Sequence, residues 1–218
     1  IKKHGGEIRL QTPITKVDIE NGAVKGVETL NGIELFDTVI STIPLPYVSR
    51  VMPDLPSEVL KQFQSVKNIA VVCVIVKLRK RLTENFWLNT NDPEMDIPGI
   101  VEYSNLRPLD HSIVYVPFYM PGEHPKFAEP DKVFLEKVRK YFKKINPDLK
   151  DEDFLDLRAS RYRFAQPIGV LGYLETIPKA KLPIDGLWVA DTSYYYPEDR
   201  GISESIEYGR KMARNAAG

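Results

Sequence analysis

The residues best suited to chemistry lie between positions 186 and 217. The apolar run Leu187–Ala190 reads as a strand that carries Asp191 at its carboxyl end, and Gly201 precedes a helix-like run from Ile202 to Ala217. An acid at the end of a strand can accept hydrogen bonds from sugar or polyol hydroxyls. The free amides of Gly201 and Ile202, at the positive end of a helix, can stabilise negative charge that develops on a ligand. The segment therefore predicts a ligand site built from a strand end, a loop and a helix N-terminus.

The same residues also allow a purely structural interpretation. A helix near the end of a chain is often preceded by a glycine, and an aspartate after a strand need not bind anything. The helix carries small and apolar residues at helical spacing, which we expect to form a narrow face for tight packing: Ile202, Ile206, Gly209, Ala213 and Ala216. The residues alone leave both interpretations open.

Composition narrows the class of protein. The 218 residues are 43% hydrophobic and 28% charged with a formal net charge of zero, which fits a globular protein and argues against a nucleic-acid partner. The longest apolar run, Ile69–Val76, is too short to span a bilayer. The single cysteine, Cys73, excludes an internal disulfide, so we expect a cytoplasmic protein. The three histidines are far apart in sequence, and we expect no metal site.

Several common catalytic and nucleotide-binding motifs are missing. The sequence contains neither a Gly-x-Gly-x-x-Gly fingerprint nor a phosphate-binding loop that ends in Gly-Lys-Ser/Thr. It also has no Gly-x-Ser-x-Gly elbow and no plausible Cys–His pair. These absences weaken a hydrolase interpretation and leave no pyrophosphate-binding loop in this chain.

The pattern of elements predicts an α+β fold. Alternating residues and the turns Asn21-Gly22 and Asn31-Gly32 predict a β-meander with strands at 7–10, 14–19, 24–30 and 33–36, followed by a buried strand that Pro44 stops. Helical spacing predicts helices near 56–63 and 134–145. Strands at 69–78, 86–88, 100–103, 112–119 and 154–164 are expected to form one larger, mostly antiparallel sheet.

Two segments resemble known flavoproteins. The stretch from Gly186 to Gly209, which includes Gly-Leu-Trp-Val-Ala-Asp and Arg-Gly-Ile-Ser-Glu-Ser, looks like the C-terminal flavin-binding segment of the FAD-dependent amine oxidase, protoporphyrinogen oxidase and phytoene desaturase superfamily. The run from Gly5 to Pro44 is similar to the middle segment of the same proteins. The two matches occur in the right order at the two ends of the chain.

The resemblance implies roles for individual residues. In such a protein Ile14 meets the adenine through its backbone, Thr42, Ile43 and Pro44 line the cofactor cleft, and Asp191 approaches the ribityl and pyrophosphate portion. Three residues lie at the isoalloxazine: Arg200, Gly201 and Ile202. The aromatic candidates for the substrate side are Tyr173, Tyr194, Tyr195 and Tyr196.

The resemblance also implies a domain plan. Residues 1–55 and 179–218 correspond to part of an FAD-binding domain, and residues 56–178 to a substrate-binding domain. Because the segment with the glycine fingerprint is missing, we expect this chain to be the C-terminal part of a larger protein, unable to hold FAD and inactive by itself.

The resemblance implies an FAD-dependent oxidoreductase that acts on a small molecule. The strand Ala70–Cys73 lacks the lysine that amine oxidases place there, which favours dehydrogenation over amine oxidation. Two alternatives remain: an isomerase similar to UDP-galactopyranose mutase, and a stand-alone binding module without catalysis. The sequence does not identify the substrate, the electron acceptor or the oligomeric state.

Overall fold

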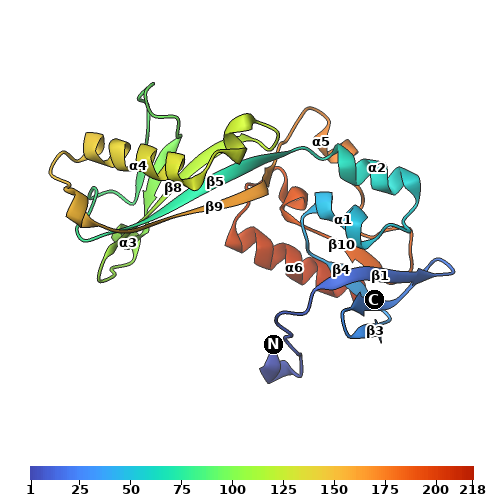
Figure 1. Cartoon of the computed structure of the whole chain (residues 1–218). Coiled ribbons are helices and arrows are strands. Elements are labelled where there is room, and N and C mark those ends of the chain that lie inside the picture. Colours follow the sequence, from blue (N-terminus) through green and yellow to red (C-terminus); the bar gives the residue numbers. More distant parts are fainter. The chain divides into compact units, whose positions relative to one another are not determined.

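The computed structural model covers residues 1–218, which form two compact units (Figure 1). The first unit combines residues 1–67 with residues 166–218, and the second contains residues 68–165. Both units mix helices with mostly antiparallel sheet, so the predicted α+β class is confirmed. The predicted segment 56–178 extends beyond the second unit at both ends.

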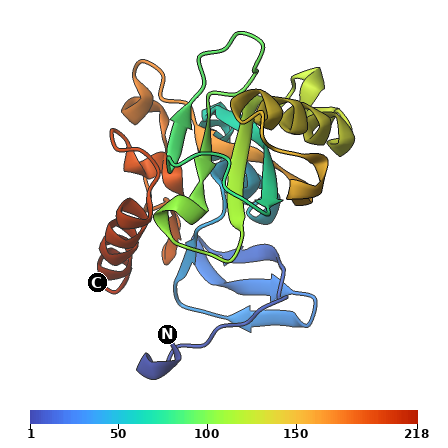
Figure 2. The same ribbon diagram turned by 90° about the vertical axis from the view of Figure 1, so that its left-hand side faces the viewer.

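A three-stranded meander begins the first unit. Strands β1 (Ile14–Glu20), β2 (Ala23–Thr29) and β3 (Gly32–Leu35) pair in sequence order and antiparallel (Figure 2). Asn21 and Gly22 have φ angles of 52° and 77°, as a tight two-residue hairpin turn requires. The predicted hairpin is therefore confirmed.

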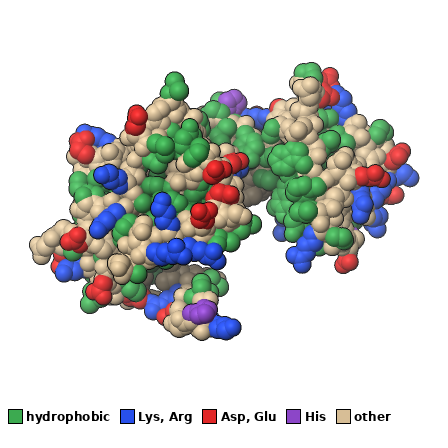
Figure 3. Space-filling model, turned by 180° about the vertical axis from the view of Figure 1, so that it is seen from behind, with side chains coloured by type: hydrophobic (Ala, Val, Ile, Leu, Met, Phe, Trp, Pro, Cys, Tyr) green, Lys and Arg blue, Asp and Glu red, His purple; other side chains and the backbone are tan.

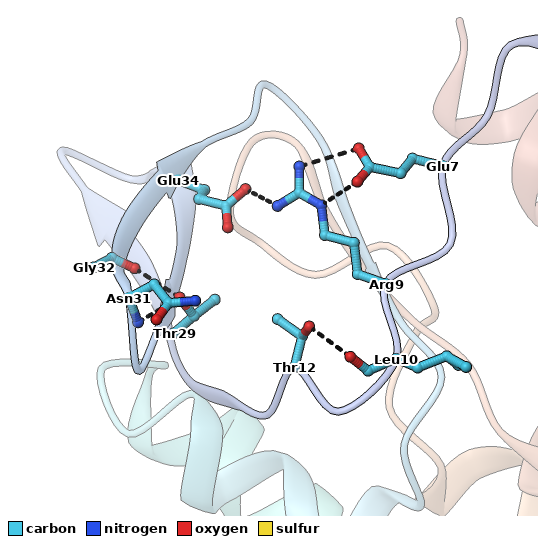
Figure 4. Close-up of polar contacts among 8 residues, drawn as sticks. All are labelled: Glu7, Arg9, Leu10, Thr12, Thr29, Asn31, Gly32 and Glu34. Atoms are coloured by element: carbon cyan, nitrogen blue, oxygen red, sulfur yellow. Dashed lines mark hydrogen bonds and ion pairs between the residues drawn. The ribbon is translucent and has the colours of Figure 1, made fainter.

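The prediction of a strand at residues 7–10 is wrong. This segment follows a 3₁₀ turn, η1 (Lys2–His4), and has no ladder partner. It is tied to the meander by side chains, because Arg9 forms ion pairs with Glu7 and with Glu34 of β3 (Figure 4). The apolar residues of the alternating pattern, Ile8 and Leu10, remain exposed. Residues 7–10 alternate as a strand does, but no neighbouring strand pairs with them.

Two short parallel strands pair the N-terminal part of the first unit with its C-terminal part. Strand β4 (Val39–Ser41) pairs with β10 (Leu187–Val189), and the amide of Ala190 extends the pairing by donating to the carbonyl of Ser41 at 2.9 Å. The strand expected over 37–43 is shorter than predicted and is not fully buried, because β10 is its one strand neighbour.

Gly186 allows the backbone just before β10 to lie close to the backbone just before β4. Its φ is +76°, and a Cβ there would lie 2.2 Å from the carbonyl oxygen of Asp37. Any side chain at this position would therefore collide with the backbone that leads into β4.

Helices complete the first unit. They are α1 (Leu45–Val51), α2 (Ser57–Ser65), α5 (Tyr173–Thr176), the 3₁₀ helix η4 (Thr192–Tyr195) and α6 (Ile202–Ala216). The core contains Leu45, Val48, Phe63, Leu187 and Val189, among others. Helix α6 buries only Met212, and Ile202 and Ile206 are 82% and 52% exposed. The predicted tight packing of the small-residue face of α6 is therefore wrong for this structure.

The second unit contains the large sheet. Its strands are β5 (Asn68–Leu78), β6 (Trp87–Asn89), β7 (Gly99–Glu102), β8 (Ser112–Pro121) and β9 (Phe154–Pro167), in the spatial order β6-β7-β8-β5-β9. Strands β5 and β8 are antiparallel over their whole length, as expected. The last two residues of β9 belong to the first unit.

One face of this sheet carries the core of the second unit. Helix α4 (Asp131–Ile145) buries Phe134, Val138, Tyr141 and Phe142 against it, which confirms the predicted stripe. On the other face Ile75, Tyr115 and Tyr119 are exposed, and Figure 3 shows hydrophobic side chains gathered on this unit. The remaining elements are α3 (Tyr103–Leu106), η2 (Pro125–Ala128) and η3 (Asp151–Asp153).

Glu102 fixes the loop after β5. This residue is 1% exposed, and its carboxyl oxygens accept hydrogen bonds from the amides of Leu82 and Thr83 and from the hydroxyls of Thr83 and Ser112. A buried carboxyl group is tolerated when its lone pairs are satisfied in this way.

None of the helices combines the length and the hydrophobicity that a membrane-spanning helix needs.

Candidate functional site

Asp191 lies near the carboxyl end of β10, as the sequence predicts, and both of its carboxylate oxygens are hydrogen-bonded. Oδ2 accepts from the amide of Leu45 at 2.8 Å, and Oδ1 accepts from the amide of Ser193 at 2.8 Å. Leu45 is the first residue of α1, so Asp191 lies beside the segment that ends at Pro44. Two regions of the predicted site are thus in direct contact.

The predicted residues on the β4 side form the crossing from that strand to α1. Thr42 is exposed, Ile43 packs against the core, and Pro44 is the N-cap residue of α1. Proline has no side chain that can cap a helix, and no side-chain hydrogen bond from Pro44 caps α1. The carboxylate of Asp191 supplies the missing acceptor.

A pocket of about 250 Å³ lies in the first unit, and the two residues that follow Asp191 in the chain are among those that line it. Three of the predicted residues, Tyr173, Tyr196 and Arg200, line it. The rings of Tyr173 and Tyr196 lie 5.3 Å apart at an angle of 51°. The other lining residues are Gln166, Pro167, Gly169, Thr192, Ser193, Pro197, Glu198 and Asp199. The pocket therefore combines aromatic surface with several polar groups.

Hydrogen bonds hold the walls of this pocket. Tyr173 is 4% exposed, and its hydroxyl donates to the carbonyl of Ser193 at 3.1 Å. Gln166 donates to Oδ1 of Asp199 at 3.1 Å, and the same oxygen accepts from the amide of Arg200 at 2.7 Å. The loop before α6 is thus joined to the end of β9.

Tyr194 and Tyr195 lie on the other side of this loop, against α6. Their rings are 5.8 Å and 5.7 Å from the ring of Tyr208. The hydroxyl of Tyr195 lies 3.1 Å from Oγ of Ser205, which in turn donates to the carbonyl of Gly201 at 2.7 Å. These contacts fasten the aromatic loop to the first turn of α6, so neither tyrosine lines the pocket.

Two buried hydroxyls at the site have no hydrogen-bond partner. They are Oγ of Ser193, a residue that is 0% exposed, and the phenol oxygen of Tyr194. Burial, followed by the nearby negative charge of Asp191, raises the pKa of Tyr194 well above its usual range. Tyr194 therefore stays a neutral group with a proton to donate. Unsatisfied buried groups of this kind often mark a position that a ligand or an ordered water completes.

The N-terminus of α6 has no side-chain cap. Gly201 is the N-cap residue, with extended backbone angles, and it has no side chain that could cap the helix. The side chain closest to Gly201 belongs to Glu204, because a Cβ on Gly201 would meet its Oε2 at 1.9 Å. The first turn therefore offers backbone donors, next to a carboxylate that can rotate.

The structure brings most of the predicted residues into one region. Asp191 joins the 42–44 segment, and Tyr173, Tyr196 and Arg200 share a pocket. Ile14 stands apart as the first residue of β1, paired with Thr29, and no hydrogen bond joins it to these residues. Sequence reasoning missed Ser193, whose amide forms a turn with Asp191. Such aspartate-initiated turns have a recognisable i to i+2 pattern that could have pointed to it.

Comparison with known proteins identifies the family. Residues 1–215 match the sequence profile of the family described as flavin containing amine oxidoreductase. No curated protein sequence matches the chain. The chain belongs to the flavin-containing amine oxidoreductase family.

Solved structures have the same fold. A protein from Exiguobacterium sp. 255-15, provisionally described as a protoporphyrinogen oxidase, is 20% identical with a TM-score of 0.73, over 96% of this chain and 47% of that one. An oxidoreductase from Methanosarcina mazei is 19% identical with a TM-score of 0.65, over 87% and 46%. Reduced UDP-galactopyranose mutase is 15% identical with a TM-score of 0.59, over 75% and 36%. The chain thus spans half or less of the length of these proteins.

Proposed function

We propose that this chain forms part of an FAD-dependent oxidoreductase in which a hydride passes from a small organic substrate to the flavin. The observation that carries the proposal is the match to the flavin family over residues 1–215, together with the uncapped start of α6 beside a pocket with an unsatisfied buried hydroxyl. The length of the structural relatives supports a further segment in the intact protein.

The residues present suit a flavin in two respects. The first amides of α6 are donors without a capping side chain, as an electron-rich ring requires. Ser193 and Tyr194 hold buried hydroxyls that still need partners. On this proposal Thr42, Ile43 and Pro44 line the cofactor cleft, and Arg200, Gly201 and Ile202 lie at the ring. Asp191 approaches the ribityl and pyrophosphate portion, and Ile14 approaches the adenine.

The flavin, when bound, supplies the two-electron acceptor, and the protein supplies position and charge. The backbone amides at Ile202 would stabilise negative charge on a ligand at the N-terminus of α6. Tyr173 and Tyr196 would present aromatic surface to the substrate. Tyr194 keeps its proton because it is buried, so it would act as a hydrogen-bond donor rather than as a base.

Residues 56–178, which include the second unit, are proposed as the substrate-binding part. The sheet of this unit has one face without a covering helix, where Ile75, Tyr115 and Tyr119 are exposed. This surface suits an apolar substrate better than a charged one, which agrees with the absence of a lysine in Ala70–Cys73.

The decisive experiment is to express the complete gene product and record its visible absorption. We expect the bands of oxidised flavin, which disappear when substrate is added without oxygen. Release of FAD rather than FMN on denaturation would identify the cofactor. A complete gene product that begins at Ile1 and binds no flavin would refute the proposal and favour a stand-alone binding module.

A flavin-dependent isomerase is the second candidate. It is supported by the fold likeness to UDP-galactopyranose mutase and by the hydroxyl, amide and acidic groups around the pocket. Such an enzyme would need reduced flavin for turnover but would give no net oxidised product. Product analysis with and without prior reduction of the flavin separates the two functions.

A further inference from the structure

Asp191 connects two segments that are 146 residues apart in the sequence. Its Oδ2 accepts from the amide of Leu45, the first residue of α1, and its Oδ1 accepts from the amide of Ser193, inside η4. Both distances are 2.8 Å, within the range of charge-assisted hydrogen bonds. Leu45 and Ser193 are both 0% exposed, so water cannot easily replace either bond.

The amides of Leu45 and Ser193 both need a hydrogen-bond acceptor, and the segment that contains Leu45 does not provide one. The first amides of a helix have no partner inside it, and Pro44 has no side chain that could cap α1. Asp191 caps η4, its own 3₁₀ helix, and caps α1 from the neighbouring strand. A single carboxylate therefore caps two helices.

This bond continues the parallel pairing of β4 and β10. The ladder runs from Val39–Leu187 to Ser41–Val189, and the amide of Ala190 adds one more bond to Ser41. The chains then leave the sheet, one toward Thr42 and one toward Tyr194. The Asp191–Leu45 bond joins them after this point.

We infer that Asp191 is a positioning residue, which fixes the Thr42–Pro44 crossing against the 192–200 loop. The inference rests on the proposed function in one respect, since that function places the cofactor cleft between these segments. It adds a role to the direct cofactor contact proposed above, because each carboxylate oxygen has a further lone pair. The residue acts on the cofactor through the backbone segments that it joins.

The first measurement uses the 218-residue chain alone and follows amide hydrogen exchange. In Asp191→Ala we expect the amides of Leu45 and Ser193 to exchange at least about tenfold faster, as the loss of a hydrogen bond to a charged group would allow. In Asp191→Asn the side-chain NH₂ group replaces one carboxylate oxygen and cannot accept a hydrogen bond. At least one of the two backbone amides therefore loses its acceptor and should exchange faster. Asp37→Asn, an exposed aspartate at the other end of β4, is the matched control and should leave both rates unchanged. Wild-type exchange at both amides in Asp191→Ala overturns the inference.

The second measurement uses the complete flavoprotein and compares Asp191→Asn with Val17→Ala. Val17 is a buried core residue of β1 that takes no part in either Asp191 hydrogen bond, and its truncation lowers stability while leaving the Asp191 carboxylate in place. We expect flavin to dissociate at least about tenfold more readily from Asp191→Asn than from Val17→Ala at equal thermal stability. Equal flavin affinity in the two variants overturns the positioning role. Absence of flavin from the wild type instead refutes the proposed function, and the exchange measurement still decides whether Asp191 joins the two segments.

Discussion

Replacing Gly201 with valine tests whether the start of α6 carries the cofactor. The backbone of Gly201 has a φ of −141° and a ψ of 168°, which valine adopts without strain. The new Cβ would lie 1.9 Å from Oε2 of Glu204, the end of a flexible side chain. Glu204 must rotate, and the valine methyl groups then stand beside the first amides of the helix.

The expected magnitudes differ for folding and for binding. Valine is a poorer N-cap residue than glycine, so the free energy of unfolding should fall by about 1 kcal/mol. Loss of access to the helix amides should cost about 1.4 kcal/mol or more of flavin binding, which is about tenfold in affinity. The variant should therefore fold while holding its flavin weakly.

The assay titrates the apoprotein of the complete flavoprotein with FAD and follows quenching of flavin fluorescence. Thermal unfolding of the same samples measures stability. Glu204→Gln is the companion variant, because it removes the nearby charge while leaving the amides open. We expect Glu204→Gln to bind FAD at least as tightly as the wild type.

Two results would refute the reasoning. Wild-type affinity in Gly201→Val would mean that no ligand approaches the first turn of α6. Equal weakening by Glu204→Gln would mean that the carboxylate, rather than open space at Gly201, supports binding.

Three further predictions concern the two units separately. Glu102→Gln should lower the free energy of unfolding of the second unit by about 2–4 kcal/mol, because the side-chain nitrogen of glutamine then faces a backbone donor. Denaturant titration measures this change. An unchanged midpoint would contradict the buried hydrogen-bond network. Gly186→Ala should destabilise the first unit by at least about 2 kcal/mol in the same assay, since its φ is positive and its Cβ would collide with backbone, and a stable variant would count against this geometry. Burial, together with the hydrogen bond to Asp96, raises the pKa of Tyr141 to about 12. The folded state therefore keeps the proton longer than the unfolded state, and the resulting stability should be complete below about pH 10 and lost as the pH rises toward 12. Tyr141→Phe should remove this part of the pH dependence, and an identical slope would refute the assignment.

The sequence predicted those elements whose pattern needs only local information. The β-branched and aromatic residues of 69–78 and 112–119 predict the paired strands β5 and β8, and the stripe from Phe134 to Phe142 predicts the buried face of α4. The positive φ angles of Asn21 and Gly22 were also predictable, because few residues accept that conformation. In each case the side chains in the pattern meet a partner within the same unit.

The failures occurred where a pattern depends on a distant partner. Residues 7–10 alternate as a strand does, yet no edge is available to them, and Arg9 reaches β3 through its side chain alone. The apolar positions of α6 follow helical spacing, yet Ile202 and Ile206 are exposed. Periodicity identifies the face that can be buried, but it does not identify what buries it.

The site shows the same limit, because the sequence gives the type of each residue but not the groups that it contacts. Sequence reasoning selected Asp191 because a carboxylate at a strand end can bind a ligand, and the structure uses that carboxylate to cap α1 and η4. The hydroxyls of Ser193 and Tyr194 are in the opposite situation, since they are buried without any acceptor or donor. Leaving such a group unsatisfied costs about 1–3 kcal/mol, so a protein keeps it where a ligand or a water repays the cost. Asp191 therefore has its carboxylate satisfied by backbone amides, and of the two unsatisfied hydroxyls only that of Ser193 belongs to a residue that lines the pocket.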